Sequence, residues 1–215
     1  MVNLSQLFNE KKQLLVSIFA NLIVQLGITY YVMEKIQISK DNKLLNNFFI
    51  LFIFQVSIIL ALVFLPMPIF MKFILFSIFS FSFGLMLSHI KDKVGPDIIK
   101  FALLGTVSIF AVMFSIGTYL IMSGIKLGYK TAIFLFYSLL LLILARLFSL
   151  FTKSSQLTKI LSFIGLIIFS GYIIYDTNTI LQRNYGGDFI RGSLDYYLDI
   201  INIFSALLGD SGLSD

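Results

Sequence analysis

The sequence predicts an all-α polytopic membrane protein, a bundle of seven transmembrane helices, on the strength of composition, charge and segmentation. Hydrophobic residues make up 58% of the 215 residues, charged residues only 13%, and the mean hydropathy is +0.95. A soluble domain has about 45–50% apolar and about 25% charged residues, and at this size it could not bury so much apolar surface. The apolar residues also fall into seven long runs separated by short polar segments. This pattern excludes a disordered chain and a coiled coil.

Each apolar run is long enough to cross a membrane, because a hydrocarbon core of about 30 Å needs about 20 helical residues. The predicted helices are 13–33, 47–65, 69–90, 98–122, 131–151, 159–181 and 193–209. The short segments between them, rich in Gly, Pro, Ser, Asp, Asn and basic residues, indicate a single transmembrane domain over 1–215. The connection Pro66-Met67-Pro68 is so short that the helices on either side should be antiparallel neighbours.

The residue inventory excludes several kinds of site. With no cysteine and a single histidine, His89, the chain cannot form a disulfide, a thiolate metal site or a histidine-rich zinc site. The net charge is +5, but the basic residues are scattered at helix ends, as in membrane flanks and not in a nucleic-acid surface. They divide almost evenly between the two membrane faces, so they do not set the orientation. Seven spans place the termini on opposite faces, and the first run is too long for a cleaved signal peptide.

Two acids lie well inside apolar runs, where a carboxylate costs at least about 2.5–3.5 kcal/mol and therefore indicates function. They are Asp176, in the sixth predicted helix, and Asp199, in the seventh. The segment Asn184-Tyr-Gly-Gly-Asp188 is a strong turn signal between these helices, and the midpoint of positions 176 and 199 falls on its Gly187 and Asp188. Residues equidistant from the turn of an antiparallel hairpin lie at equal depth. Both carboxylates are therefore expected at one level inside the bundle.

A polar stripe accompanies each acid. At helical spacing Tyr172 shares a face with Asp176, and Asp195 and Asn202 share a face with Asp199. Two facing stripes predict a wet crevice or a proton-binding site. Two carboxylates in a low-dielectric site cannot easily both ionise, so the pair should share a proton and titrate as a unit. The ionised pair is also an incomplete calcium site, because calcium needs about six to eight oxygens.

The sequence leaves more than one role open for several of these polar residues. The two acids either carry function or hydrogen-bond neighbouring helices purely for assembly. Supporting donors or ligands are expected at Tyr172, Tyr175 and Asn202. Asp188 and Asp195 are either solvated or form an acidic mouth above the pair. Arg146 either extends to the membrane interface or supplies a counter-charge for the acids. Two glutamines, Gln25 and Gln55, are expected to hydrogen-bond between helices.

Two segments of the C-terminal third carry paired Tyr-Asp and Leu-Asp motifs. They are Ile167-Ile-Phe-Ser-Gly-Tyr-Ile-Ile-Tyr-Asp-Thr177 and Leu198-Asp-Ile-Ile-Asn-Ile-Phe-Ser-Ala-Leu-Leu208. With a looser match that begins at Phe83-Gly-Leu-Met-Leu-Ser-His-Ile90, they resemble the transmembrane Bax inhibitor motif family, also called Bax inhibitor-1-like. The resemblance spans about positions 83–208. It implies a seven-helix bundle with the last helix near its centre.

The resemblance also implies a pH-sensitive calcium leak, in which the family's two sensor aspartates fall on Asp176 and Asp199. Calcium would be a permeant or transient ligand, with no tightly bound cofactor. Members from animals, plants and viruses suppress cell death from the endoplasmic reticulum or Golgi, which implies membrane-protein partners, whereas bacterial members lie in the plasma membrane. The chain departs from some bacterial members, because Leu65-Pro-Met-Pro68 replaces an arginine cluster and only Lys72 is near. An arginine latch on the pair is therefore not expected.

Two other functions remain as alternatives. A non-transporting scaffold would regulate cell death through protein partners alone. An intramembrane aspartyl protease would use Tyr175-Asp176 and Gly209-Asp210. However, Asp210 lies roughly 16 Å from the level of Asp176 by helical rise, so the sequence predicts that the protein is not an enzyme.

Overall fold

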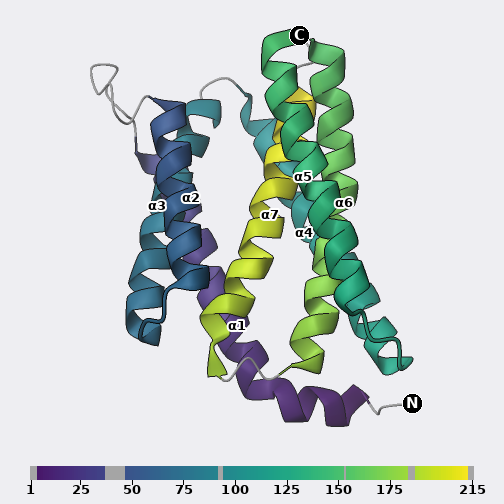
Figure 1. The fold of residues 1–215 in the computed structure, drawn as a ribbon. Helices are drawn as coiled ribbons and strands as arrows, with labels where there is room; N and C mark the ends of the chain where they lie inside the picture. Colours follow the sequence, from purple (N-terminus) through teal and green to yellow (C-terminus); the bar gives the residue numbers. More distant parts are fainter. Residues whose placement is uncertain (1–3, 37–46, 92–93, 153, 184–186, 213–215) are drawn as a thin grey trace. The chain divides into compact units, whose positions relative to one another are not determined.

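The computed structural model describes residues 4–36, 47–91, 94–152, 154–183 and 187–212. Within these residues the chain forms seven α-helices and no strand (Figure 1). The helices are α1 (Leu4–Lys35), α2 (Phe48–Phe64), α3 (Ile69–Lys91), α4 (Pro96–Met122), α5 (Tyr129–Thr152), α6 (Ser155–Gln182) and α7 (Phe189–Gly212). One helix lies over each predicted run, which confirms the all-α fold. The termini, expected on opposite membrane faces, lie outside the described residues.

Five helices, α1 and α3 to α6, are long and apolar enough to cross a membrane by length and composition. The helix α2 is apolar but has 17 residues. The helix α7 has 24 residues, and its polar side chains, among them Asp195, Asp199 and Asn202, lower its hydropathy. Many of its side chains are nevertheless buried, with Tyr196, Tyr197 and Ile203 fully so. Such a helix tolerates polar residues because these residues face protein and not lipid.

Side-chain caps lie at the starts of α2 and α6. Asn47 accepts the backbone N–H groups of Phe49 and Ile50 at 3.0 and 3.3 Å at the start of α2. Ser154 accepts the N–H of Leu157 at 3.3 Å at the start of α6. Asparagine and serine are preferred at this position because their side chains satisfy N–H groups that have no partner within the helix.

The described helices belong to two compact units. Unit 1 consists of Met1–Gln13, Pro96–Asn184 and Leu198–Asp215, and it contains α4, α5, α6 and the second part of α7. Unit 2 consists of Leu14–Gly95 and Tyr185–Tyr197, and it contains most of α1, α2, α3 and the first part of α7. The helix α7 therefore contributes to both units, and the single domain predicted over 1–215 stays a prediction.

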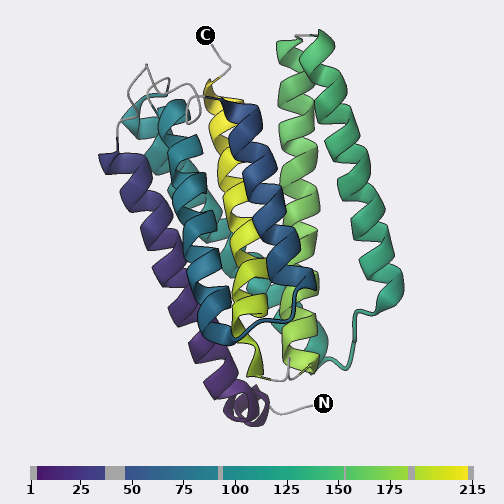
Figure 2. The same ribbon diagram turned by 60° about the vertical axis from the view of Figure 1, so that its left-hand side comes forward.

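In unit 1, α4 and α5 both pack against α6, and Figure 2 shows α5 beside α6. Its core contains buried side chains from α5, α6 and α7, namely Leu142, Leu161, Phe169, Ile173 and Ile203. The helix α4 packs tightly on α6 at Gly117, where an added Cβ would lie 2.7 Å from the carbonyl oxygen of Ile174. Only glycine permits this approach. The contact lies within one turn of Asp176.

In unit 2, α2 and α3 pack against each other, as the short connection predicts. Buried polar groups join α1 to α3: Gln25 Nε2 donates to Ser77 Oγ at 3.2 Å, and Ser80 Oγ donates to Gln25 Oε1 at 2.9 Å. The interhelical role predicted for Gln25 is thus confirmed. Gln55 differs, because its buried Nε2 has no hydrogen-bond partner among the described residues.

Candidate functional site

The two membrane acids lie in the same unit, on α6 and on the second part of α7. The two helices run antiparallel in this unit. A Cβ added at Gly209 would lie 3.5 Å from Ser162 Oγ, and further along, Ile203 joins the core cluster that contains Ile173. Continuing in the same directions for one more turn leads to Asp176 on α6 and to Asp199 on α7.

Tyr172 lies within electrostatic range of both acids. It lies one turn before Asp176 on α6, and its side chain is half-buried. The charges of Asp176 and Asp199 both act on its hydroxyl group. Asp199 is only 4% exposed, whereas Asp176 is half-buried. Unit 1 therefore gathers two carboxylates and two phenols from α6 and α7.

Two other predicted residues of unit 1 have partners of their own. Asn202 Nδ2 donates to the carbonyl oxygen of Leu198 at 2.7 Å, within α7, which leaves the amide oxygen of Asn202 as its potential ligand atom. The Arg146 guanidinium lies beside α6, with Nη2 3.1 Å from the position of a Cβ at Gly165. Gly165 is about 16 Å along α6 from Asp176. The structure therefore does not bring Arg146 to the pair as a counter-charge.

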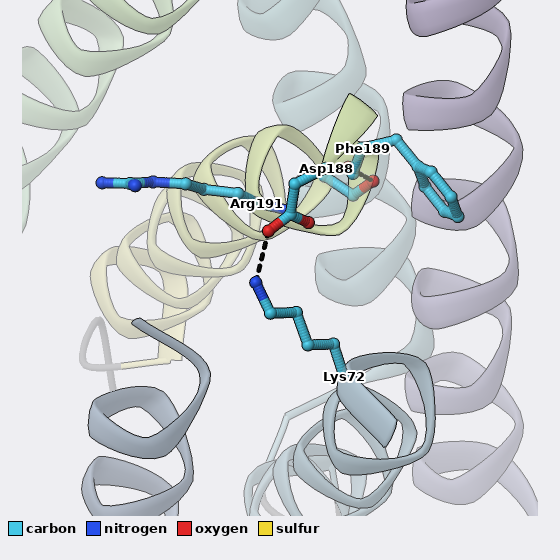
Figure 3. Close-up of polar contacts among 5 residues, drawn as sticks. Lys72, Asp188, Phe189 and Arg191 are labelled. Carbon is cyan, nitrogen blue, oxygen red and sulfur yellow. Dashed lines mark hydrogen bonds and ion pairs between the residues drawn. The ribbon is translucent and has the colours of Figure 1, made fainter. Parts of the chain in front are cut away.

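A second charged cluster lies in unit 2, where α7 begins. Asp188 forms an ion pair with Lys72 of α3 (Figure 3), and the two side chains are 22% and 18% exposed. Asp188 Oδ1 also accepts the backbone N–H of Arg191 at 3.3 Å, so Asp188 caps α7. Figure 3 shows the Arg191 side chain extending away from this carboxylate.

Asp195 belongs to this cluster of unit 2 and not to the pair's unit. It is half-buried, and the charges of Arg191 and Asp188 act on it. The expected acidic mouth of Asp188 and Asp195 is thus partly neutralised by Lys72 and Arg191. The turn predicted at 184–188 lies partly outside the described residues, but Gly187 has a φ of +85°, which glycine adopts readily.

Sequence reasoning missed Asn178, two residues after Asp176. It is fully buried, and its amide bonds to the backbone of the connection between α4 and α5. A signal was present, because Asn178 and Gln182 are two amides at i, i+4 spacing in an apolar helix. The side chain of Asp210, which a protease would require, lies outside the described residues.

Comparison with known proteins assigns the chain to a family. A family model described as "Inhibitor of apoptosis-promoting Bax1" matches residues 11–209. The chain is 38% identical over 74 residues to the Golgi anti-apoptotic protein of Vaccinia virus (strain Lister), over 34% of this chain and 31% of that protein. It is 31% identical over 134 residues to Protein LIFEGUARD 1 of Arabidopsis thaliana, over 60% of this chain and 54% of that protein.

A third relative is Protein lifeguard 4 of Mus musculus, 36% identical over 74 residues, which are 34% of this chain and 31% of the relative. The chain thus spans between about a third and about half of the length of these relatives. The family model, in contrast, covers nearly the whole chain. The membrane helices, the paired aspartate motifs and this match agree that the chain belongs to the Bax1 inhibitor family of membrane proteins, the Bax inhibitor-1-like family.

Proposed function

We propose that the protein conducts cations passively, with calcium as the main ion. We further propose that pH modulates this conduction through the pair Asp176 and Asp199. The observation that supports the proposal is the antiparallel packing of α6 and α7, in which Gly209 lies against Ser162 and Ile203 shares a core cluster with Ile173. Asp176 and Asp199, from two helices, are therefore expected at one level of unit 1. An arrangement built only for assembly does not require two carboxylates at one level.

The environment of the pair gives protons and cations a common site. Removing a carboxylate from water is costly, and Asp199 is almost completely buried. A shared proton lowers the charge of the pair and so lowers this cost. A cation that enters the ionised pair serves the same electrostatic purpose. Protons and permeant cations would therefore compete, which makes the conduction depend on pH.

Calcium fits this site as a passing ion. Within the described residues, no group of three or more His, Asp or Glu side chains is arranged to hold a metal ion. Asp176 and Asp199 supply carboxylate oxygens and Asn202 an amide oxygen, so backbone carbonyls or water must complete the coordination. A weak, incomplete site suits conduction, because an ion must leave as readily as it enters.

Suppression of cell death is a second candidate function, favoured by the names of the Vaccinia virus and LIFEGUARD relatives. It requires either the calcium leak or membrane-protein partners. A pH-independent scaffold would suppress cell death in cells even when Asp176→Asn and Asp199→Asn abolish the leak. A protein that acts through the leak would lose both properties together.

The experiment is calcium flux into liposomes that contain the purified protein and an entrapped calcium indicator, over a series of pH values. Liposomes without protein, and liposomes with the Asp97→Asn variant, are the controls, because the Asp97 side chain is 97% exposed at the start of α4. A calcium leak that changes with pH in the absence of partners supports the proposal. Inserted protein that conducts no calcium at any pH overturns it, and cleavage of a peptide would favour a protease.

A further inference from the structure

Every hydrogen-bonding position of the Asn178 side-chain amide has a partner, although Asn178 lies within an apolar helix. It is 0% exposed. Its Oδ1 accepts the N–H of Leu127 at 2.9 Å and a bond from Gln182 Nε2. Its Nδ2 donates to the carbonyl oxygens of Ile125 at 3.0 Å and Gly117 at 3.5 Å. An amide has two donor and two acceptor positions, and all four are used here.

These bonds hold the connection between α4 and α5. Gly124, with a φ of +79°, ends α4, and the bonds Gly124 N to Ile121 O and Ile125 N to Leu120 O form a Schellman motif. Between this motif and the start of α5, the backbone groups of the connection are not hydrogen-bonded within a helix. The side chains of Asn178 and Gln182 bond this backbone instead. Besides the bonds of Asn178, Gln182 Nε2 donates to the carbonyl oxygen of Leu127 at 3.2 Å.

A second constraint lies on the same side of α6, where Gly117 of α4 contacts the helix. A Cβ at Gly117 would be 2.7 Å from Ile174 O and 2.8 Å from Thr177 Cβ. The side chains of Thr177 and Asn178 thus face α4 and the connection that follows it. At about 100° per residue, Asp176 and Asn178 point in nearly opposite directions. The hydrogen bonds of Asn178 therefore hold one face of this segment of α6, and Asp176 lies on the opposite face.

We propose that Asn178 is a positioning residue for Asp176, which it serves by clamping the α4–α5 connection onto α6. The role rests on the proposed function, because it concerns one member of the proposed cation pair. Ionisable groups of the neighbouring elements include Tyr172 and Tyr175 on α6 and Asp199 on α7. Lys126 in the connection and Lys130 at the start of α5 are both exposed.

The first test measures whether the clamp exists. The chain has no native cysteine, so Leu127→Cys places one thiol on the half-buried side chain of the clamped connection. Replacing Asn178 by Leu in this background should raise the rate of thiol labelling about fivefold or more. Loss of one hydrogen bond of ordinary net strength changes a local opening equilibrium by about that factor. Gln182→Leu, which removes fewer bonds, should give a smaller increase.

The matched control is Thr179→Val on the same helix. Thr179 is 6% exposed, and its Oγ1 has no hydrogen-bond partner among the described residues. The substitution is isosteric and removes no bond, so it should leave the labelling rate at position 127 unchanged. An equal increase with Thr179→Val and Asn178→Leu would mean that general loosening of α6 is the cause, and the clamp would be refuted.

The second test measures the position of Asp176 without relying on conduction. Dicyclohexylcarbodiimide modifies carboxyl groups in apolar surroundings, and mass spectrometry of peptides reports the modification rate of Asp176 at one fixed pH. Asn178→Leu should change this rate severalfold, and Thr179→Val should not. If Asn178→Leu releases the connection but leaves the rate at Asp176 unchanged, the positioning role is wrong. A failure of calcium flux would instead overturn the proposed function, and the two labelling rates would still decide this inference.

Discussion

Lys72 in the first turn of α3 forms an ion pair with Asp188, the residue that caps α7. The Asp188 carboxylate thus makes two interactions. One oxygen pairs with the lysine of α3, and the other accepts a backbone N–H of α7. Both partners are largely shielded from water, at 18% and 22% exposure. The pair is therefore expected to contribute more than an exposed ion pair does.

The ion pair and the cap can be separated by substitution. Asparagine is as good a cap as aspartate, so Asp188→Asn removes the charge and retains the cap. Lys72→Gln and Asp188→Asn should each lower the free energy of unfolding by about 1–2 kcal/mol, and the double variant should cost little more than either. Asp188→Ala should cost about 1 kcal/mol beyond Asp188→Asn because it also removes the cap. Unfolding in mixed micelles measures all four variants, and additive single effects would argue against the pair.

Close helix contact at Gly117 gives a second prediction. Gly117→Ala should destabilise unit 1 by about 1–3 kcal/mol, because the new Cβ meets the Ile174 carbonyl oxygen and Thr177 Cβ and not a flexible side chain. Gly27→Ala is the control, since an added Cβ there meets nothing within 4 Å. In helix α1 this change should be neutral or stabilising by about 0.5–1 kcal/mol. Thermal unfolding in detergent compares them, and equal effects would refute the close contact.

Two buried glutamines offer a comparison of hydrogen bonding with the same substitution. Gln25 is 0% exposed and bonds to Ser77 and Ser80, whereas Gln55 is 4% exposed and its Nε2 is unbonded within the described residues. Gln25→Leu should cost about 1–2 kcal/mol, because interhelical bonds in membranes contribute about 0.6 kcal/mol each and unpaired serines remain. Gln55→Leu should be neutral or stabilising. Equal losses of stability would show that Gln55 has a partner in the folded protein.

The helices were predictable because a membrane leaves the chain few choices. Backbone groups in lipid must bond within the segment, so a run of about 20 apolar residues becomes a helix. The start of α1 at Leu4 was not predictable in this way, because the segment before Gln13 is largely polar. Part of that segment is held by tertiary contact, since Lys11 Nζ donates to the carbonyl oxygen of Arg183 at 3.1 Å.

The site was predictable where it depends on spacing along the chain and not where it depends on packing. The symmetry of the α6–α7 hairpin predicts that Asp176 and Asp199 lie at one level. The partners of Asn178 and Asp188 are 51 and 116 residues away in sequence, and no local pattern relates them. Arg146 shows the same limit, because its position beside Gly165 follows from how α5 packs on α6.

The final prediction treats Asp176 and Asp199 as one titrating unit. In a shared-proton pair each carboxylate suppresses ionisation of the other, so Asp176→Asn or Asp199→Asn should each flatten or shift the pH dependence of calcium flux. The double variant should not show the sum of the two changes, because the second substitution acts on a pair that no longer exists. Asp97→Asn, at an exposed position of α4, should leave the profile as it is in the unmodified protein. If each single variant keeps that profile, or if Asp97→Asn alters it equally, the acids do not share a proton and serve the assembly of the helices instead.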